Sequence, residues 1–265
     1  MSPNPNAIAA ADTFHLPLTS VMMAGIIPAL FGLILTYFLA KRLINKGSKV
    51  TDKEVIVLET QNLPSFLTAL VAPLVAILLL ALRPLFDIKV DPLIALPLGG
   101  LIGVLCMGKL RNINSYAING LSKMTPVAIM LLGTGALAGI IANSGLKEVL
   151  IQGLEHSGLP SYILAPISGV LMSLATASTT AGTAVASNVF SSTLLELGVS
   201  SLAGAAMIHA GATVFDHMPH GSFFHATGGS VNMDIKERLK LIPYESAVGL
   251  MMTIVSTLIF GVFKF

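Results

Sequence analysis

Long apolar runs separated by short polar connections dominate the chain. The runs that reach or approach the roughly 20 residues needed to cross a bilayer cover 18–40, 64–86, 92–107, 124–143, 201–215 and 243–263. Lys41 and Arg42 begin a basic cluster directly after the first run, and such clusters normally lie in the cytoplasm. We therefore expect an all-α polytopic membrane protein whose first span runs inward and whose polar connection, up to residue 62, is cytoplasmic.

The stretch 171–189 interrupts this pattern because it carries many hydroxyls inside an apolar region. Two interpretations compete: a close-packed interface of small residues, or a broken helix whose loosened backbone and hydroxyls bind a solute within the membrane. On a regular helix Ser178, Thr179 and Thr180 would point about 100° apart. Three adjacent hydroxyls serve one ligand better from a turn, so we predict a substrate-binding tip here.

The apolar arms beside this stretch, 160–174 and 183–197, are short for complete crossings. A re-entrant hairpin near 160–197 fits their length, since irregular backbone at membrane depth is tolerated where it is buried or lines a cavity. Two ordinary short spans are the alternative, and they would reverse the orientation of everything that follows. The hairpin leaves Lys236, Arg238 and Lys240 in the cytoplasm, so the distribution of positive charge favours it.

Composition supports a protein whose principal partner is the lipid bilayer. The 265 residues are 54% hydrophobic and 11% charged, whereas soluble proteins average about 25% charged residues. The net charge of +2 is small and the basic residues lie in short loops, which gives no support to a nucleic-acid partner. The single cysteine, Cys106, excludes a disulfide framework.

The segment 209–225 gathers candidate ion-coupling residues. It holds four of the six histidines and Asp216; an ionised Asp at a helix centre costs about 2.5–3.5 kcal/mol on insertion scales, so Asp216 should lie near water or a partner. Histidine exchanges protons near neutral pH. We interpret Asp216, His217 and His220 as ion-coupling residues. An interfacial loop of satisfied polar residues is one alternative.

A zinc site is a second, weaker interpretation of the same segment. Asp and His are competent zinc ligands, but His217-x-x-His220 lacks an HExxH motif and a cysteine partner. We therefore expect no metal site, no cofactor and no enzymatic activity.

Four runs follow one another along the chain: the Gly-rich run 133–146, the amphipathic piece ending in Gly158-Leu-Pro160, the hydroxyl hairpin, and the junction 235–246. This order resembles that of the gluconate permease (GntP) family, secondary carriers of the ion transporter superfamily. The chain resembles the C-terminal portion of such a permease. The resemblance implies one transporter domain over 1–265, with inverted repeats, re-entrant hairpins and a truncated first repeat that ends within 1–62.

The resemblance also implies a substrate site between two hairpin tips, at the repeat interface. One side would be lined by Pro3, Asn4, Pro5 and Asn6, and the other by Ser178, Thr179 and Thr180. The chain departs from the family pattern at Pro219 and His220, so the substrate and the coupling ion do not carry over. Carriers of this architecture are often dimers, and a homodimer is a further expectation.

These observations predict a multi-pass carrier of the bacterial inner membrane. It would move a small organic anion, gluconate-like or another hydroxy acid, by symport with a proton. A sodium-coupled di- or tricarboxylate carrier is one alternative. A cation/proton antiporter that uses Asp216 and the hydroxyls for its ion is another, and an intramembrane metalloenzyme is the third.

Overall fold

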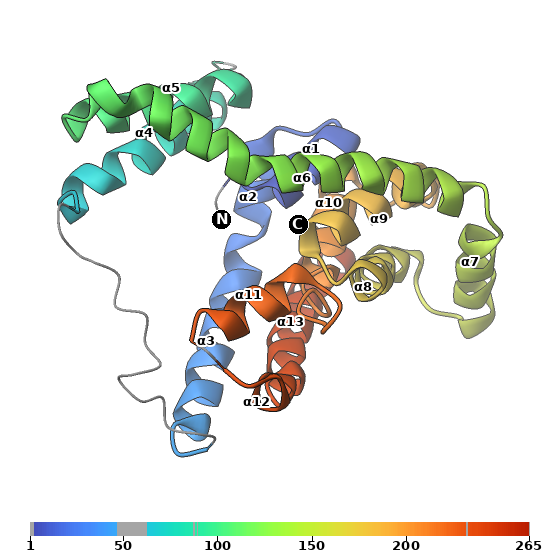
Figure 1. Ribbon diagram of the computed structural model, residues 1–265. Helices are drawn as coiled ribbons and strands as arrows, with labels where there is room; N and C mark the ends of the chain where they lie inside the picture. The colour runs from blue at the N-terminus through green and yellow to red at the C-terminus, as the bar shows by residue number, and fades with distance from the viewer. Residues whose placement is uncertain (1–2, 47–62, 87, 89, 232, 265) are drawn as a thin grey trace. The chain divides into compact units, whose positions relative to one another are not determined.

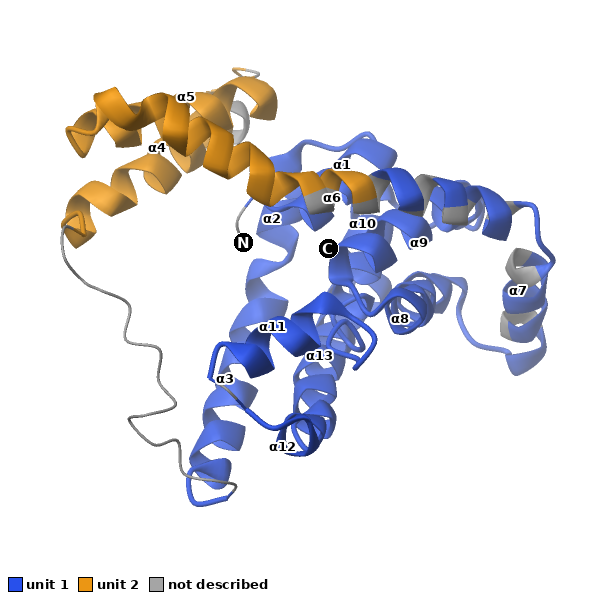
Figure 2. Ribbon diagram, viewed as in Figure 1, with its two compact units in different colours: residues 1, 3–56, 130–265 blue, residues 2, 57–129 orange. Residues whose placement is uncertain are grey.

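The computed structural model describes residues 3–46, 63–86, 88, 90–231 and 233–264 (Figure 1). All regular structure in these ranges is helical, as the apolar pattern predicted. The chain divides into two compact units (Figure 2): unit 1 comprises residues 1, 3–56 and 130–265, and unit 2 comprises residues 2 and 57–129. Most of the predicted cytoplasmic connection, from residue 47 to residue 62, lies outside the described residues.

Unit 2 is built on two apolar helices, α4 (Phe66–Phe86) and α5 (Pro92–Cys106), that pack against each other. Asp91 caps α5 by accepting a hydrogen bond of 2.7 Å from the Leu93 amide. Gly99 and Gly103 lie one turn apart on α5, where added Cβ atoms would come within 2.7 Å of the Ala72 carbonyl and 2.6 Å of its Cβ. The two small residues thus permit a close approach of the helices.

A short 3-10 turn, η1 (Leu110–Asn112), follows α5 and leads into the long helix α6 (Ile113–Ala142), which continues from unit 2 into unit 1. The predicted span 124–143 is therefore only the second part of a longer helix. The amphipathic segment expected at 147–156 forms α7 (Leu146–Ser157).

Unit 1 contains the remaining helices. Its N-terminal part holds α1 (Pro5–Thr13), α2 (Leu18–Ala24) and α3 (Ile26–Leu43). Its C-terminal part holds η2 (Ser161–Ile163), α8 (Leu164–Thr176), α9 (Thr179–Glu196), α10 (Ser201–Gly211), α11 (Ser222–Gly229), α12 (Ile235–Leu239), α13 (Ile242–Thr257) and the π-helical turn η3 (Leu258–Val262). The core lies where α8, α9 and α10 pack together, with α1 against α9 and α3 against α13.

Small residues set the spacing in this core. A Cβ added at Gly169 of α8 would lie 2.3 Å from the Ile208 carbonyl oxygen on α10, and one at Gly211 of α10 would lie 2.3 Å from the Pro166 carbonyl oxygen on α8. The two helices therefore touch backbone to backbone. This close contact of α8 and α10 lies outside the hydroxyl stretch 171–189, although α8 continues into that stretch.

Two segments of the described chain are long and apolar enough to cross a membrane, judged by length and composition. They are Leu18–Leu43 and Ile235–Val262, with mean hydropathy 2.2 and 1.7. Shorter apolar helices cover Phe66–Leu82, Pro92–Cys106 and Ser161–Thr176. The helices agree with a membrane protein, whereas the inverted repeat and the re-entrant path of the hairpin stay predictions.

Candidate functional site

The chain breaks between α8 and α9 at Ala177 and Ser178. Ala177 adopts a left-handed conformation (φ 46°, ψ 41°), and Ser178 is extended (φ −152°, ψ 124°). The Ser178 hydroxyl accepts a hydrogen bond of 3.2 Å from the Ala181 amide, as expected of a serine at a helix N-cap. The break was expected here, but α9 begins at Thr179, four residues earlier than the predicted second arm.

Thr179 and Thr180 occupy the first turn of α9 and point to different partners. Thr179 Oγ1 donates a hydrogen bond of 2.5 Å to Asp216 Oδ2, and Thr180 Oγ1 donates to Asn6 Oδ1. Successive residues on a helix point about 100° apart, so the two hydroxyls diverge. The expectation that Ser178, Thr179 and Thr180 turn together toward one ligand is wrong in this respect.

The start of α1 contributes one side chain to the break. Asn4 caps α1, since its Oδ1 accepts a hydrogen bond of 2.8 Å from the Ala7 amide. Pro5 is the first residue of the helix, a position that suits proline. Pro3 precedes the cap and is partly exposed. Among residues 3–6, which the resemblance assigned to one side of the substrate site, Asn6 is the one with a described side-chain hydrogen bond to α9.

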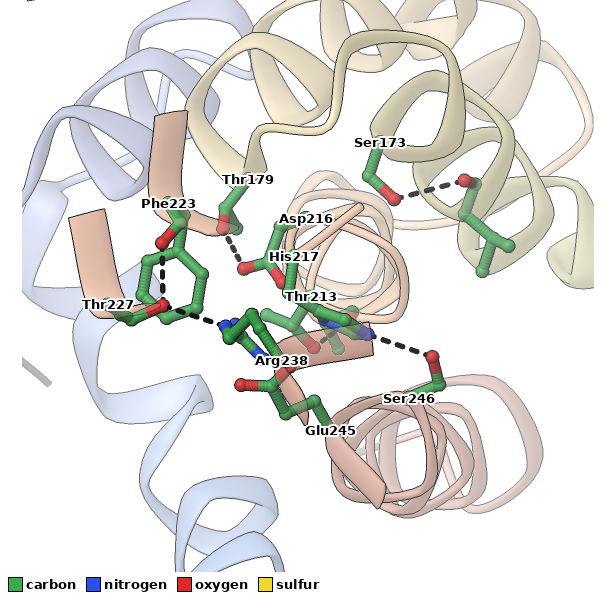
Figure 3. A network of polar contacts seen from close by, with 12 residues as sticks. Ser173, Thr179, Thr213, Asp216, His217, Phe223, Thr227, Arg238, Glu245 and Ser246 are labelled. Atoms are coloured by element: carbon green, nitrogen blue, oxygen red, sulfur yellow. Dashed lines mark hydrogen bonds and ion pairs between the residues drawn. The ribbon is translucent and has the colours of Figure 1, made fainter. Parts of the chain in front are cut away.

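Asp216 and His217 lie in the loop after α10 and form a chain of contacts with α13 (Figure 3). His217 Nδ1 lies 3.1 Å from Asp216 Oδ1, and His217 Nε2 lies 2.9 Å from Ser246 Oγ. The carboxylate can only accept, so Nδ1 donates to it and the Nε2 of a neutral ring accepts from the Ser246 hydroxyl. The His217 side chain is 2% exposed and that of Asp216 is 22% exposed. The Asp216 carboxylate is therefore more accessible to solvent than the His217 ring.

Ser246 is a site residue that the sequence interpretation did not single out. It lies in the first turns of α13, directly after Glu245. A hydroxyl near the start of an otherwise apolar helix was the available signal. Nothing in the local pattern indicated that it faces a histidine 29 residues earlier.

His220 belongs to the same loop but contacts α8. Its Nε2 donates a hydrogen bond of 3.1 Å to the Leu174 carbonyl, one of the last carbonyls of α8 that the helix itself leaves without a partner. Next to it, a Cβ added at Gly221 would lie 2.3 Å from the Ala177 carbonyl oxygen. His220 and Gly221 thus hold the loop against the helix break, and His220 is directed to α8 rather than to Asp216.

A buried ion pair adjoins this network (Figure 3). Arg238 on α12 is 2% exposed, and its Nη1 donates a hydrogen bond of 2.7 Å to Glu245 Oε2 on α13. Its Nε lies 3.2 Å from Thr227 Oγ1 on α11, and its guanidinium carbon lies 4.9 Å from the centre of the Phe224 ring. Arg238, which the sequence predicted to lie on the cytoplasmic side, therefore connects α12 to α11 and α13.

No group of three or more His, Cys, Asp or Glu side chains that could hold a metal ion occurs in the part of the chain that the structure describes. The metalloenzyme alternative therefore has no structural support within these residues. The oxygen atoms gathered at the break are the hydroxyl of Thr179 and the carboxylate of Asp216, with the Thr180 hydroxyl and the Asn6 amide oxygen beside them.

Comparison with known proteins identifies similarity to transporters. A family model described as "Na+-H+ antiporter family" matches residues 68–157, from α4 to α7. A curated relative from Haemophilus influenzae, described as an "uncharacterized transporter", is 99% identical over 265 residues, which is all of this chain and 63% of the relative. The chain thus spans less than two thirds of that relative's length. No solved structure matches.

The resemblance to gluconate permeases is wrong. The family model that matches is that of Na+-H+ antiporters, and neither comparison points to gluconate carriers. The resemblance rested on the order of runs rich in glycine and hydroxyl residues. Such runs serve close helix packing in membrane proteins of many kinds, as Gly169 and Gly211 do here, so their order carries little family information.

The comparisons point to a transporter and not to an enzyme, and together with the apolar helices they indicate a membrane protein. They favour sodium ions or protons as partners. The organic anion and the homodimer, both expected from the sequence, receive no support from them. The matched segment 68–157 ends before the network around Asp216 and does not include it.

Proposed function

We propose that this chain carries the ion-binding part of a cation/proton antiporter of the bacterial inner membrane, in which Asp216 binds Na+ and H+ in turn. One observation carries the proposal: Asp216 has both oxygens held, Oδ2 by the Thr179 hydroxyl at the start of α9 and Oδ1 by the buried His217. The family match over 68–157 supports the class of transport.

Exchange follows from the chemistry of a single carboxylate. Asp216 can neutralise one positive charge, so a bound Na+ and a bound proton exclude each other. Hard cations prefer oxygen ligands, and the Thr179 hydroxyl adds an oxygen beside the carboxylate. Release of the proton on one side of the membrane therefore prepares Asp216 for the cation.

His217 fixes the orientation of this carboxylate. Its ring is held on the other side by Ser246, so Nδ1 presents a hydrogen to Asp216 Oδ1 in a defined direction. Oδ2 is left facing Thr179 and the helix break. We therefore assign cation binding to Asp216 and Thr179, and positioning to His217 and Ser246.

The test is sodium-driven proton movement in proteoliposomes that contain a pH-sensitive dye, made with this chain and with the longer Haemophilus influenzae relative. We expect an inward Na+ gradient to drive protons out, and Asp216→Asn to abolish this movement. Asp234→Asn is the matched control, because Asp234 caps α12 through the Lys236 amide and Asn caps helices as well as Asp does. Absence of exchange from folded, unaltered protein, or full exchange by Asp216→Asn, would contradict the proposal.

A further inference from the structure

We infer that Thr183 and Ser187 form a second binding site for the transported cation. They lie one and two turns along α9 from Thr179, which contacts Asp216. This inference rests on the proposed antiport. The Thr183 and Ser187 hydroxyls would be cation ligands additional to Asp216 and Thr179, inside the core of unit 1.

The two hydroxyls are buried and unpartnered. Thr183 and Ser187 are each 0% exposed, and neither Oγ atom has a hydrogen-bond partner among the described residues. Most buried side-chain polar atoms have at least one partner, because an unsatisfied one forfeits its hydration without compensation. Two such atoms one turn apart on a single helix therefore call for an explanation.

Several other helical threonines in this chain show the usual solution, although the Thr193 hydroxyl on α9 is also buried without a partner among the described residues. The hydroxyls of Thr13, Thr36 and Thr253 each donate to the carbonyl four residues earlier, at 2.8 to 2.9 Å. This local bond is the common way for a Ser or Thr within a helix to satisfy its hydroxyl. Thr183 and Ser187 do not use it, so the lone pairs of their hydroxyl oxygens remain available to a ligand.

Helical spacing links these hydroxyls to the carboxylate. Residues four apart on a helix share a face, with Cβ atoms about 5–6 Å apart, so Thr179, Thr183 and Ser187 form a row. The first member of the row already donates to Asp216 Oδ2. The row thus starts at the proposed ion-binding carboxylate and leads into the helix core, where α9 packs against α1, α8 and α10.

Neutral hydroxyl oxygens suit a site that binds the cation weakly. They offer lone pairs to a dehydrated Na+ but no charge, so they hold it more weakly than Asp216 does. Ion passage requires sites that bind well enough for entry and weakly enough for release. A cation displaced from Asp216 by an arriving proton would find the Thr183 oxygen one turn along α9 and the Ser187 oxygen two turns along it.

The experiment uses Thr183→Val, which keeps the shape and removes the hydroxyl, and Ser187→Ala. Two quantities are measured: the Na+ concentration for half-maximal exchange in proteoliposomes, and the Tm in detergent with NaCl or with choline chloride at equal ionic strength. Because each variant removes one ligand, we expect the half-maximal concentration to rise about fivefold or more. The Na+-dependent increase in Tm should shrink in parallel.

Two variants separate ligation from packing. Thr183→Ser keeps the hydroxyl and should restore the Na+ response. Ser168→Ala on α8 is the matched control, since Ser168 is also 0% exposed but its hydroxyl donates a hydrogen bond of 2.8 Å to the Ala165 carbonyl. It should leave the half-maximal concentration unchanged.

The outcomes distinguish this inference from the proposal on which it rests. An unaltered Na+ response in both Thr183→Val and Ser187→Ala, with exchange intact, would contradict the second cation-binding site. It would not contradict the proposed antiport at Asp216. That result would assign the two hydroxyls to bound water or to packing. Absence of any Na+ response in the unaltered protein would overturn both.

Discussion

The Thr179 hydroxyl donates a hydrogen bond of 2.5 Å to Asp216 Oδ2 and so joins the first turn of α9 to the loop that follows α10 (Figure 3). The two residues are 37 positions apart in the chain. The bond connects one hydroxyl of the α8–α9 break to the carboxylate of the neighbouring loop. Any movement of the break relative to this loop therefore changes the surroundings of Asp216 directly.

Thr179→Val should weaken Na+ binding while the protein remains folded. A hydrogen bond to a charged group contributes about 1.5–3 kcal/mol, so we expect the apparent Na+ affinity to fall about 10- to 100-fold. The measurement is the Na+ dependence of proton movement in proteoliposomes. Thr179→Ser keeps the donor and serves as the control. Equal affinities for the Val and Ser variants would show that the contact is not part of the ion site.

Asn6 and Thr180 should be coupled in stability. Their hydrogen bond connects α1 to the start of α9, and such bonds contribute about 0.5–1.5 kcal/mol. A double-mutant cycle with Asn6→Ala and Thr180→Val, measured by equilibrium unfolding in detergent, should give a coupling energy in this range. As a control, Asn6→Asp retains an acceptor oxygen and should keep most of the stability. Strictly additive effects of the two substitutions would refute the link.

Arg238→Met should destabilise unit 1 strongly. Removing one partner of a buried ion pair costs about 3–5 kcal/mol, and because the Glu245 side chain is 32% exposed we expect about 3 kcal/mol, at the low end of that range. Thermal unfolding in detergent measures the effect. The control is Lys240→Ala, which removes the i,i+3 pair with Glu237 in which Lys240 is 69% exposed. Surface pairs contribute about 0–1 kcal/mol, so similar losses in both variants would contradict the buried role of Arg238.

The apolar pattern predicted helix positions well where a run is bounded by a cap or a proline. The prediction of 92–107 corresponds to α5, whose start is set by Asp91 and Pro92. The break at the hydroxyl stretch was also predictable, because Ser178 is a strong N-cap. The long polar start of α6 was missed because only the apolar second part stands out in the sequence.

The contacts that build the site could not be predicted in the same way. Periodicity indicates which residues share a face of one helix, but it does not say which faces of different helices meet. Thr180 contacts a residue 174 positions away, and His217 contacts one 29 positions away. Asp216, His217 and Thr179 were candidates from their chemistry, and they stay predictions; that Thr179 contacts Asp216 and that Ser246 contacts His217 follow only from the packing of α9 and α13.

Gly221→Ala should impair exchange through displacement of the loop that carries Asp216. A Cβ at this position would lie 2.3 Å from the Ala177 carbonyl oxygen and 2.6 Å from the Ala177 Cβ. The backbone at Gly221 (φ −100°, ψ 154°) is open to any residue, so the effect is purely steric. The loop must move away from the break, which lengthens the Thr179–Asp216 hydrogen bond, and overpacking of this kind costs about 1–3 kcal/mol.

We expect the Gly221→Ala variant to show an apparent Na+ affinity reduced about tenfold, since one lost charged hydrogen bond accounts for such a change. Na+-driven proton movement in proteoliposomes is again the measurement. Gly229→Ala is the matched control: Gly229 is the last residue of α11, the helix that Gly221 precedes, and no described atom comes within 4 Å of its added Cβ. If both variants behaved alike, the approach of Gly221 to Ala177 would not determine the position of Asp216. A loss of Na+ affinity in Gly221→Ala but not in Gly229→Ala would show that the position of the Asp216 loop depends on its contact with the α8–α9 break.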